Sequence, residues 1–312
     1  MYYDLNVPWS STTKDAELQR KIAFLVELGY QVLALNNTIA PDSKSGKLPQ
    51  DMSCPIPRTL PFPVPAKTQI LRRLTLVIND HTQNHRLKDL VSPNSGYDIV
   101  AIRPVDEKTL QAACLNLDCD LISLDLSARY FFHFQYKMFA AAVARGVHIE
   151  LCYGPGILGT AEQRRMLIQN AAALIRVTRG RGLIISSECH DIMACRGPAD
   201  IVNLAAVWGL GQERGVEAVT TEARKVAVNS RFRRSSYRGV VDIIYGGENT
   251  RAERRKQGMG QQEQDSGANG DSSANHKRKF AEMNSTVEQA EKPLSNRQKK
   301  KMAKEAAKAA AP

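Results

Sequence analysis

The 312-residue sequence predicts an α/β protein of the (β/α)8 TIM-barrel type, followed by a disordered basic tail. Runs of β-branched and apolar residues alternate with helical patterns as far as Tyr245. Such alternation is typical of parallel strands joined by right-handed crossovers. The sequence contains eight of these runs, the number that closes a barrel of this type. A doubly wound open sheet is the main alternative.

The expected strands are short, and helical patterns lie between most of them. In chain order they span residues 2–7, 31–37, 73–80, 97–104, 120–127, 147–154, 182–188 and 216–220.

The helical segments carry stop and start signals. Several of them finish at a glycine, where a helix stop is expected: Gly29, Gly146, Gly180 and Gly209. Thr160, with Gln three residues later, has the spacing of a capping box. The glycines of 153–159 predict a tight strand-to-helix turn, since proline stands where a phosphate cradle would need a donor NH. The expected helices span residues 15–29, 107–117, 135–146, 160–180 and 200–211.

A proline-rich stretch at 37–68 interrupts this alternation. It holds seven of the chain's 14 prolines, so neither an ordinary helix nor a central strand is expected there. We interpret it as an extended surface loop. Two roles stay open for it: a docking strap for a partner, or a passive insertion.

Residues 246–312 differ in composition from the rest. They contain 14 Lys or Arg against 9 Asp or Glu and no long apolar periodic segment, which predicts a disordered basic tail. The clusters HKRKF at 276–280 and RQKKK at 297–301 are typical of nuclear import signals. The domain prediction is therefore a barrel over 1–245 and a tail over 246–312.

Net charge, apolar runs and cysteine content indicate the kind of partner and the cellular compartment. The net charge of +11 favours a polyanion. The longest clean apolar run, at 138–144, is far below the roughly 20 residues that span a bilayer, so no membrane partner is expected. The six cysteines form no CxxC pair, and we interpret them as unpaired thiols of a reducing compartment.

The carboxyl ends of the strands are where a barrel of this type does chemistry. Asp4 and Asn6 share one face of the first expected strand, where His-x-His would be the efficient metal-binding pattern. Asn is a poor ligand for a catalytic zinc-type ion, so no metal site is expected. The alternative is a structural role, in which these side chains form hydrogen bonds with loop backbones. The metal-ligand candidates at the strand ends are Asp4, His81, Asp125, Glu188 and His190.

A basic segment at 225–238 contains no acid. Its Lys and Arg residues are interleaved with Phe232 and Tyr237, which suits phosphate contacts with occasional base stacking. A solvated helix face is the alternative. The sequence contains no compact RNA-binding fingerprint.

Several segments together resemble one family. They are DLNVPW at 4–9, RLTLVIND at 73–80, LDLSARYFFHF at 124–134, ARGVHIELCYGPGI at 144–157, LIISSECHDIMACRGPADIVNLAAVWGLG at 183–211 and the basic VNSRFRRSSYRGVV at 228–241. This chain resembles the barrel-shaped, thirty-kilodalton-class protein subunit of nuclear ribonuclease P and ribonuclease MRP, and its proline-rich loop and tail look fungal.

The resemblance implies a function. The family barrel is similar to that of the polymerase-and-histidinol-phosphatase metallohydrolases without their metal centre. Catalysis then belongs to the RNA subunit, and the barrel stabilises that RNA beside a small ferredoxin-like protein. The substrates are precursor tRNA and precursor ribosomal RNA, the location is the nucleus and its nucleolus, and no cofactor is expected. The alternative is a metal-dependent phosphoesterase of the related enzyme type.

The resemblance also points to RNA-binding residues. Arg103, Arg129 and Arg196 match basic strand-end and loop positions of the family, and the charged C-terminal end of the barrel corresponds to the basic segment. With Lys225 of that segment, the expected RNA-binding residues are Arg103, Arg129, Arg196, Lys225, Arg231, Arg233, Arg234 and Arg238.

Overall fold

The computed structural model describes residues 1–41, 48–49, 51–80, 84–92 and 95–235. All of them belong to the first of two compact units, Met1–Tyr245. The tail, Arg238 and His81 lie outside the described residues. No helix in the described ranges is long and apolar enough to cross a membrane.

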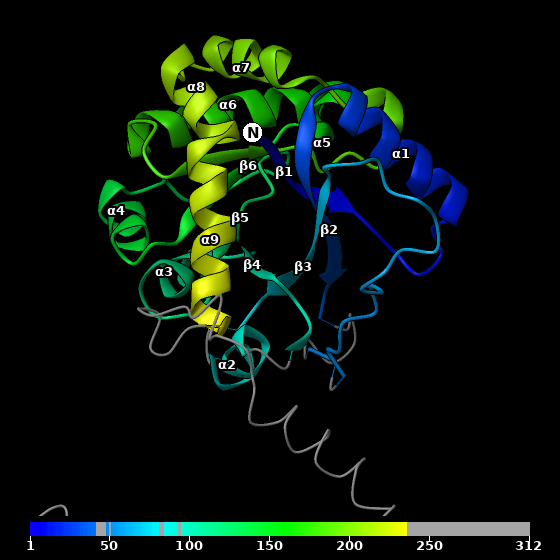
Figure 1. The fold of residues 1–312 in the computed structure, drawn as a ribbon. Coiled ribbons are helices and arrows are strands. Elements are labelled where there is room, and N and C mark those ends of the chain that lie inside the picture. The colour runs from blue at the N-terminus through cyan, green and yellow to red at the C-terminus, as the bar shows by residue number, and fades with distance from the viewer. Residues whose placement is uncertain (42–47, 50, 81–83, 93–94, 236–312) are drawn as a thin grey trace, which may run out of the picture. The chain divides into compact units, whose positions relative to one another are not determined.

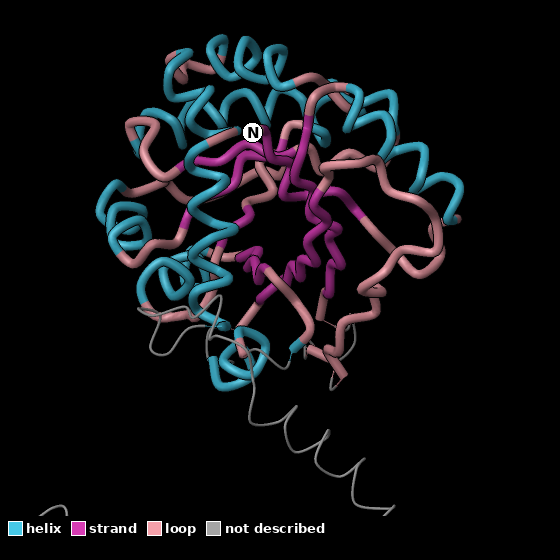
Figure 2. Tube along the Cα trace, viewed as in Figure 1, coloured by secondary structure: helices cyan, strands magenta, loops and turns pink. Residues whose placement is uncertain are grey.

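Parallel strands form a ring with helices around its outside (Figures 1 and 2). Buried apolar side chains from both layers fill the space between strands and helices. In the described ranges the strands are β1 (Tyr2–Pro8), β2 (Tyr30–Ile39), β3 (Gln69–Ile78), β4 (Ile99–Pro104), β5 (Leu121–Ser123), β6 (His148–Cys152) and β7 (Leu183–Ser186).

The strand order follows the sequence from β1 to β7 without reversal, which excludes the doubly wound alternative. The ring nearly closes where the segment after β7 meets β1. The backbone N–H of Ser187 donates to Asp4 Oδ1 at 3.0 Å, and the backbone N–H of Glu188 donates to the Asn6 carbonyl at 2.9 Å. The barrel class predicted from the sequence is confirmed.

The helices follow the expected pattern at most positions. The capping box predicted at Thr160 is present, with Thr160 Oγ1 accepting from the Gln163 N–H at 3.3 Å. The glycine stops are also confirmed, since Gly29, Gly146 and Gly209 all have positive φ. The helices of the described ranges are α1 (Asp15–Glu27), α2 (Asn84–Val91), α3 (Glu107–Leu115), α4 (Tyr136–Ala144), α5 (Gly154–Leu158), α6 (Ala161–Thr178), η2 (Ile192–Ala194), α7 (Pro198–Val207), α8 (Gln212–Val219) and α9 (Thr221–Ser235).

The eighth expected strand, at 216–220, is wrong, because most of this segment belongs to α8. The β-branched run resembles a strand, yet Gly215, Ala218 and Val219 are buried on one helical face. Gly215 lets α8 pack closely on α7, since a Cβ there would lie 3.1 Å from the Val202 side chain. Seven strands therefore make the ring in the described part of the chain.

The proline-rich segment lies between β2 and β3, where other crossovers carry a helix (Figure 2). The strand β2 continues to Ile39, two residues beyond the expected end at 37. Leu48 and Ile56 of the segment are buried, and Met52 and Phe62 pack partly buried against the same core. An extended chain thus covers this side of the barrel in place of a helix.

The helix α9 crosses the end of the barrel at which the strands begin (Figure 1). Ala223 and Val226 of α9 join an apolar layer inside the ring that includes Val32, Ile99 and Ile184. Further along the strands the inward-facing residues become polar. The inside of the barrel is therefore apolar at the end covered by α9 and polar toward the carboxyl ends of the strands.

Candidate nucleic-acid interface

A buried ion pair lies inside the barrel. Arg73 of β3 and Glu150 of β6 are both fully buried, and the Arg73 Nη2 to Glu150 Oε2 distance is 2.6 Å. The second guanidinium nitrogen, Nη1, donates to Glu150 Oε1 and to the Leu5 carbonyl at 2.7 Å, and Nε donates to Thr75 Oγ1 at 3.1 Å. Because every nitrogen of the guanidinium has an acceptor, the pair satisfies itself without a ligand.

The charge state of Glu150 follows from this geometry. Burial alone would raise its pKa, but the charge and hydrogen bonds of Arg73 lower the pKa to about 2. The carboxylate is therefore ionised at neutral pH. A metal ion placed beside it would have to compete with a guanidinium that already holds both oxygens.

The side chains on the first strand complete the polar layer. Asn36 Nδ2 donates to Asn6 Oδ1 at 2.7 Å, and Thr75 Oγ1 donates to Asn36 Oδ1 at 2.8 Å. Burial raises the pKa of Asp4, against hydrogen bonds from Ser187 and Asn6 that lower it. Asp4 thus accepts hydrogen bonds from backbone N–H groups, as the structural alternative expected. The side chain of Asn6 instead bonds the Asn36 amide inside the barrel.

The remaining metal-ligand candidates do not converge. Asp125 Oδ1 accepts from the Ser127 hydroxyl at 2.6 Å, and Glu188 pairs with Arg103 at 2.6 Å. His190 is exposed, and its carbonyl accepts from Lys21 Nζ at 2.7 Å. Among the residues that the structure describes, no three His, Cys, Asp or Glu side chains form a group that could hold a metal ion.

Three of the expected RNA-binding arginines lie at the carboxyl end of the barrel. Arg103 is held by Glu188 and by the Ser123 hydroxyl, which accepts from its Nη2 at 3.0 Å. Arg196 donates from Nη1 to the carbonyls of Met193 and Cys195 at 2.8 and 2.9 Å. Arg129 is exposed, and its guanidinium lies 5.4 Å from the centre of the Phe131 ring.

Four of the others, Lys225, Arg231, Arg233 and Arg234, lie on α9, at the opposite end. Arg233 and Arg234 both contact the buried carboxylate of Asp120, at 3.3 and 2.9 Å. Arg233 also donates to the Cys119 carbonyl, and the side chain of Arg234 is only 8% exposed. Both guanidinium groups therefore hold α9 against the start of β5.

Two further members of the expected RNA-binding set, Lys225 and Arg231, lie in the described part of α9 and are exposed. Lys225 pairs with Glu222 at 2.6 Å, and Arg231 is exposed near the last turn. The structure thus divides the expected RNA-binding set between two ends of the barrel. The sequence-based prediction grouped these residues as one set, because the sequence alone does not show which end of the ring each segment reaches.

The ion pair inside the barrel was missed. No sequence pattern pointed to Arg73, which is fully buried. A signal was present at Glu150, which stands between Ile149 and Leu151 in the middle of the expected strand 147–154, where a charge needs a buried partner.

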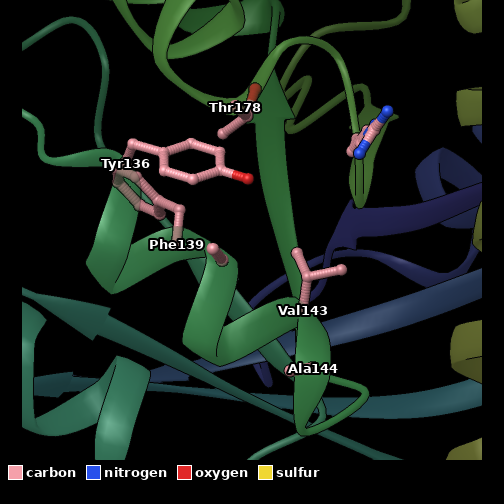
Figure 3. Close-up of a pocket in the computed structure, with 7 residues that line it drawn as sticks. Tyr136, Phe139, Val143, Ala144 and Thr178 are labelled. Atoms are coloured by element: carbon pink, nitrogen blue, oxygen red, sulfur yellow. The ribbon is translucent and has the colours of Figure 1, made fainter.

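A cavity of about 250 Å³ opens between α4 and the end of α6. Tyr136, Phe139 and Val143 line it along α4, and Thr178 of α6 lies opposite (Figure 3). Arg181 stands in its lining, so the cavity has one cation and no carboxylate among its lining residues. It contains no catalytic pair.

Fold and site together define a barrel protein whose inside is filled by its own side chains. The described members of the expected RNA-binding set lie at its two ends. The family model of RNase P subunit p30 matches residues 1–235. The chain therefore belongs to the RNase P subunit p30 family.

Relatives support this assignment. The chain is 36% identical to the probable ribonuclease P protein subunit 3 of Schizosaccharomyces pombe, over 78% of this chain and 99% of the relative. It is 31% identical to ribonuclease P protein subunit p30 of Mus musculus, over 78% and 90%. It is also 31% identical to ribonuclease P/MRP protein subunit RPP1 of Saccharomyces cerevisiae, over 79% and 86%.

A solved structure has the same fold. A chain in the cryo-EM structure of archaeal ribonuclease P with mature tRNA superposes with a TM-score of 0.55 at 15% identity. The match covers 78% of this chain and 98% of that chain.

Proposed function

We propose that this chain is a non-catalytic protein subunit of ribonuclease P and ribonuclease MRP that binds and stabilises their RNA. The observation that carries the proposal is the Arg73–Glu150 pair. It fills the inside of the barrel with a self-satisfied network, next to the carboxyl ends of the strands where barrels of this type carry catalytic groups. Membership of the RNase P subunit p30 family supports a place in the ribonuclease P complex. The relative named as a ribonuclease P/MRP subunit supports a place in both complexes.

On this proposal the RNA subunit performs the chemistry, and the barrel supports 5′ maturation of precursor tRNA and processing of precursor ribosomal RNA. Its protein partners include a small ferredoxin-like subunit. The location is the nucleus, with the nucleolus as the site of ribosomal RNA processing. The basic clusters at 276–280 and 297–301 support nuclear import.

The experiment that tests the complex is purification of the tagged full chain from its own cells, followed by sequencing of the bound RNA. We expect the RNAs of both ribonucleoproteins to be enriched over total RNA. Enrichment of neither RNA, in a preparation that is folded by circular dichroism, would refute the proposal.

Arg129 offers a clean probe of RNA binding at the carboxyl end of the barrel. Replacing Arg103 would leave Glu188 without its cation, whereas the Arg129 guanidinium lies over the Phe131 ring. Arg129→Ala should weaken binding to the ribonuclease P RNA and reduce the salt slope of log K by about 0.7 to 0.9 if it contacts one phosphate. Arg20→Ala, an exposed arginine of α1, is the matched control.

A further inference from the structure

A crevice of about 500 Å³ opens beside α9 at the end of the barrel where the strands begin. Three segments far apart in sequence build it: the proline-rich segment, the chain around the starts of β3 and β4, and the last turns of α9. Its cationic lining residues are Arg58, Arg72, Arg231 and Arg234.

The proline-rich segment is fixed in place as one wall. The Tyr97 hydroxyl donates to the Ser53 carbonyl at 3.1 Å and accepts from Asn37 Nδ2 at 3.2 Å. At Gly96, where φ is +80°, an added Cβ would lie 3.1 Å from the Cys54 Cβ, so the two segments touch closely. Arg58 therefore reaches the crevice from a segment that is packed on the barrel.

Charge in the crevice is strongly unbalanced. Asp98 is its one acidic lining residue, and it lies 3.5 Å from Arg72. On the other flank of α9 a second hollow, of about 580 Å³, is lined by Lys88, Arg145 and Arg233 with Asp118. Cations thus line both sides of the last turns of α9.

Apolar side chains also line the crevice. Leu71 of β3 and Ala227 and Val228 of α9 are among its lining residues. A crevice that combines guanidinium groups with apolar side chains fits a phosphodiester strand, which presents phosphates together with sugar and base faces. An extended RNA strand is favoured over an acidic protein segment because the chain belongs to a ribonucleoprotein family.

We propose that a single-stranded segment of the RNA subunit lies in this crevice, with Arg58 and Arg231 contacting its phosphates. This inference rests on the proposed function, since it assumes that the chain binds that RNA. It adds a second contact, at the opposite end of the barrel from Arg129. It also gives the proline-rich segment a role as part of an RNA-binding site.

The test compares two double variants of the full chain by titration against ribonuclease P RNA at several salt concentrations. Arg58→Ala/Arg231→Ala removes two crevice cations while leaving Asp98 and Asp120 with their arginines. Lys14→Ala/Arg20→Ala removes two exposed cations near and on α1. The crevice variant should reduce the salt slope of log K by about 1.4 to 1.8, the value for two phosphates, while the control keeps most of it.

A second measurement locates the RNA. A hydroxyl-radical source attached at Arg58→Cys should cleave a discrete stretch of the RNA, whereas the same source at Arg20→Cys should not cleave that stretch. If the crevice variant keeps the wild-type slope and position 58 yields no cleavage, the inference is wrong while RNA binding itself stands. Loss of a protein subunit from the purified complex at unchanged RNA slope would assign the crevice to an acidic protein instead. A wild-type chain without RNA affinity would refute the proposed function.

Discussion

At the residue scale, the Arg73–Glu150 pair shows how the inside of the barrel is held together. Removing two charges from water is costly, and their mutual attraction offsets that cost only with good geometry and further hydrogen bonds. Both conditions are met, because the guanidinium holds both carboxylate oxygens, the Leu5 carbonyl and the Thr75 hydroxyl. We therefore expect replacement of both charged residues to destabilise the fold less than replacement of one.

Breaking the pair from one side should be costly. Glu150→Leu leaves Arg73 buried without its carboxylate, and we expect a loss of about 3 to 5 kcal/mol in the free energy of unfolding. Arg73→Met/Glu150→Leu removes both charges and should recover most of that loss. Denaturant unfolding of the single and double variants measures the difference. A double variant as unstable as Glu150→Leu would show that the pair fixes the barrel in some further way.

The contribution of the same pair to stability should depend on pH. The folded pKa of Glu150, about 2, lies below its unfolded value of about 4.3. Its stabilising contribution is therefore present above pH 4.3 and is lost as the pH falls through about 2. Stability measured over this window should fall less in the double variant. Asp4 acts in the opposite sense, since its raised pKa gives a contribution that is lost as pH rises.

At the scale of elements, α9 is held to the barrel by side chains more than 110 positions apart in sequence. Asp120→Asn keeps the shape but removes the charge shared by Arg233 and Arg234. We expect a loss of about 1.5 to 3 kcal/mol and faster amide hydrogen exchange in 221–235. Glu217→Gln, which breaks the exposed pair with Arg214, is the control and should change neither quantity much. Unchanged exchange in α9 would show that apolar contacts alone hold it.

The end of α7 offers a second test at this scale. Trp208 is 7% exposed, whereas its neighbour Val207 is 82% exposed. Trp208→Ala should lower the free energy of unfolding by roughly 3 to 5 kcal/mol, and Val207→Ala by no more than about 0.5 kcal/mol. Thermal and denaturant unfolding measure both. If Trp208→Ala melts like the wild type but fails to assemble with its complex, the ring belongs to an interface with a partner subunit.

Local signals in the sequence predicted most elements correctly. The capping box at Thr160 and the glycines after helices gave reliable ends, because cap geometry depends on neighbouring residues. The segment at 216–220 failed because its valines suit a strand, while its burial against α7 depends on tertiary packing. The position of α9 across the ring, and with it the division of the arginines between two ends, depends on contacts such as Arg234–Asp120 that no local pattern contains.

At the scale of the whole molecule, we predict that the barrel is independent of residues 246–312. Their composition offers little apolar surface, so removing them should leave the melting temperature unchanged. Nuclear accumulation should drop, because both basic clusters are lost. Fluorescence imaging of the full and shortened chains measures this. A melting temperature several degrees lower, or complete nuclear entry without the tail, would contradict the prediction.

The isolated protein should hydrolyse neither RNA nor phosphate esters when supplied with magnesium, manganese or zinc. Asn6 stands where a metal-binding histidine would be useful, and it is bonded to Asn36 inside the barrel. Glu150 is held by Arg73 on both oxygens, which leaves Asp4 as the remaining buried carboxylate of the polar layer near the strand ends. One carboxylate is too few ligands for a hydrolytic metal centre. Turnover by the purified chain that disappears in Asp4→Asn but persists in Lys14→Ala, with both variants folded, would overturn this prediction and favour a phosphoesterase.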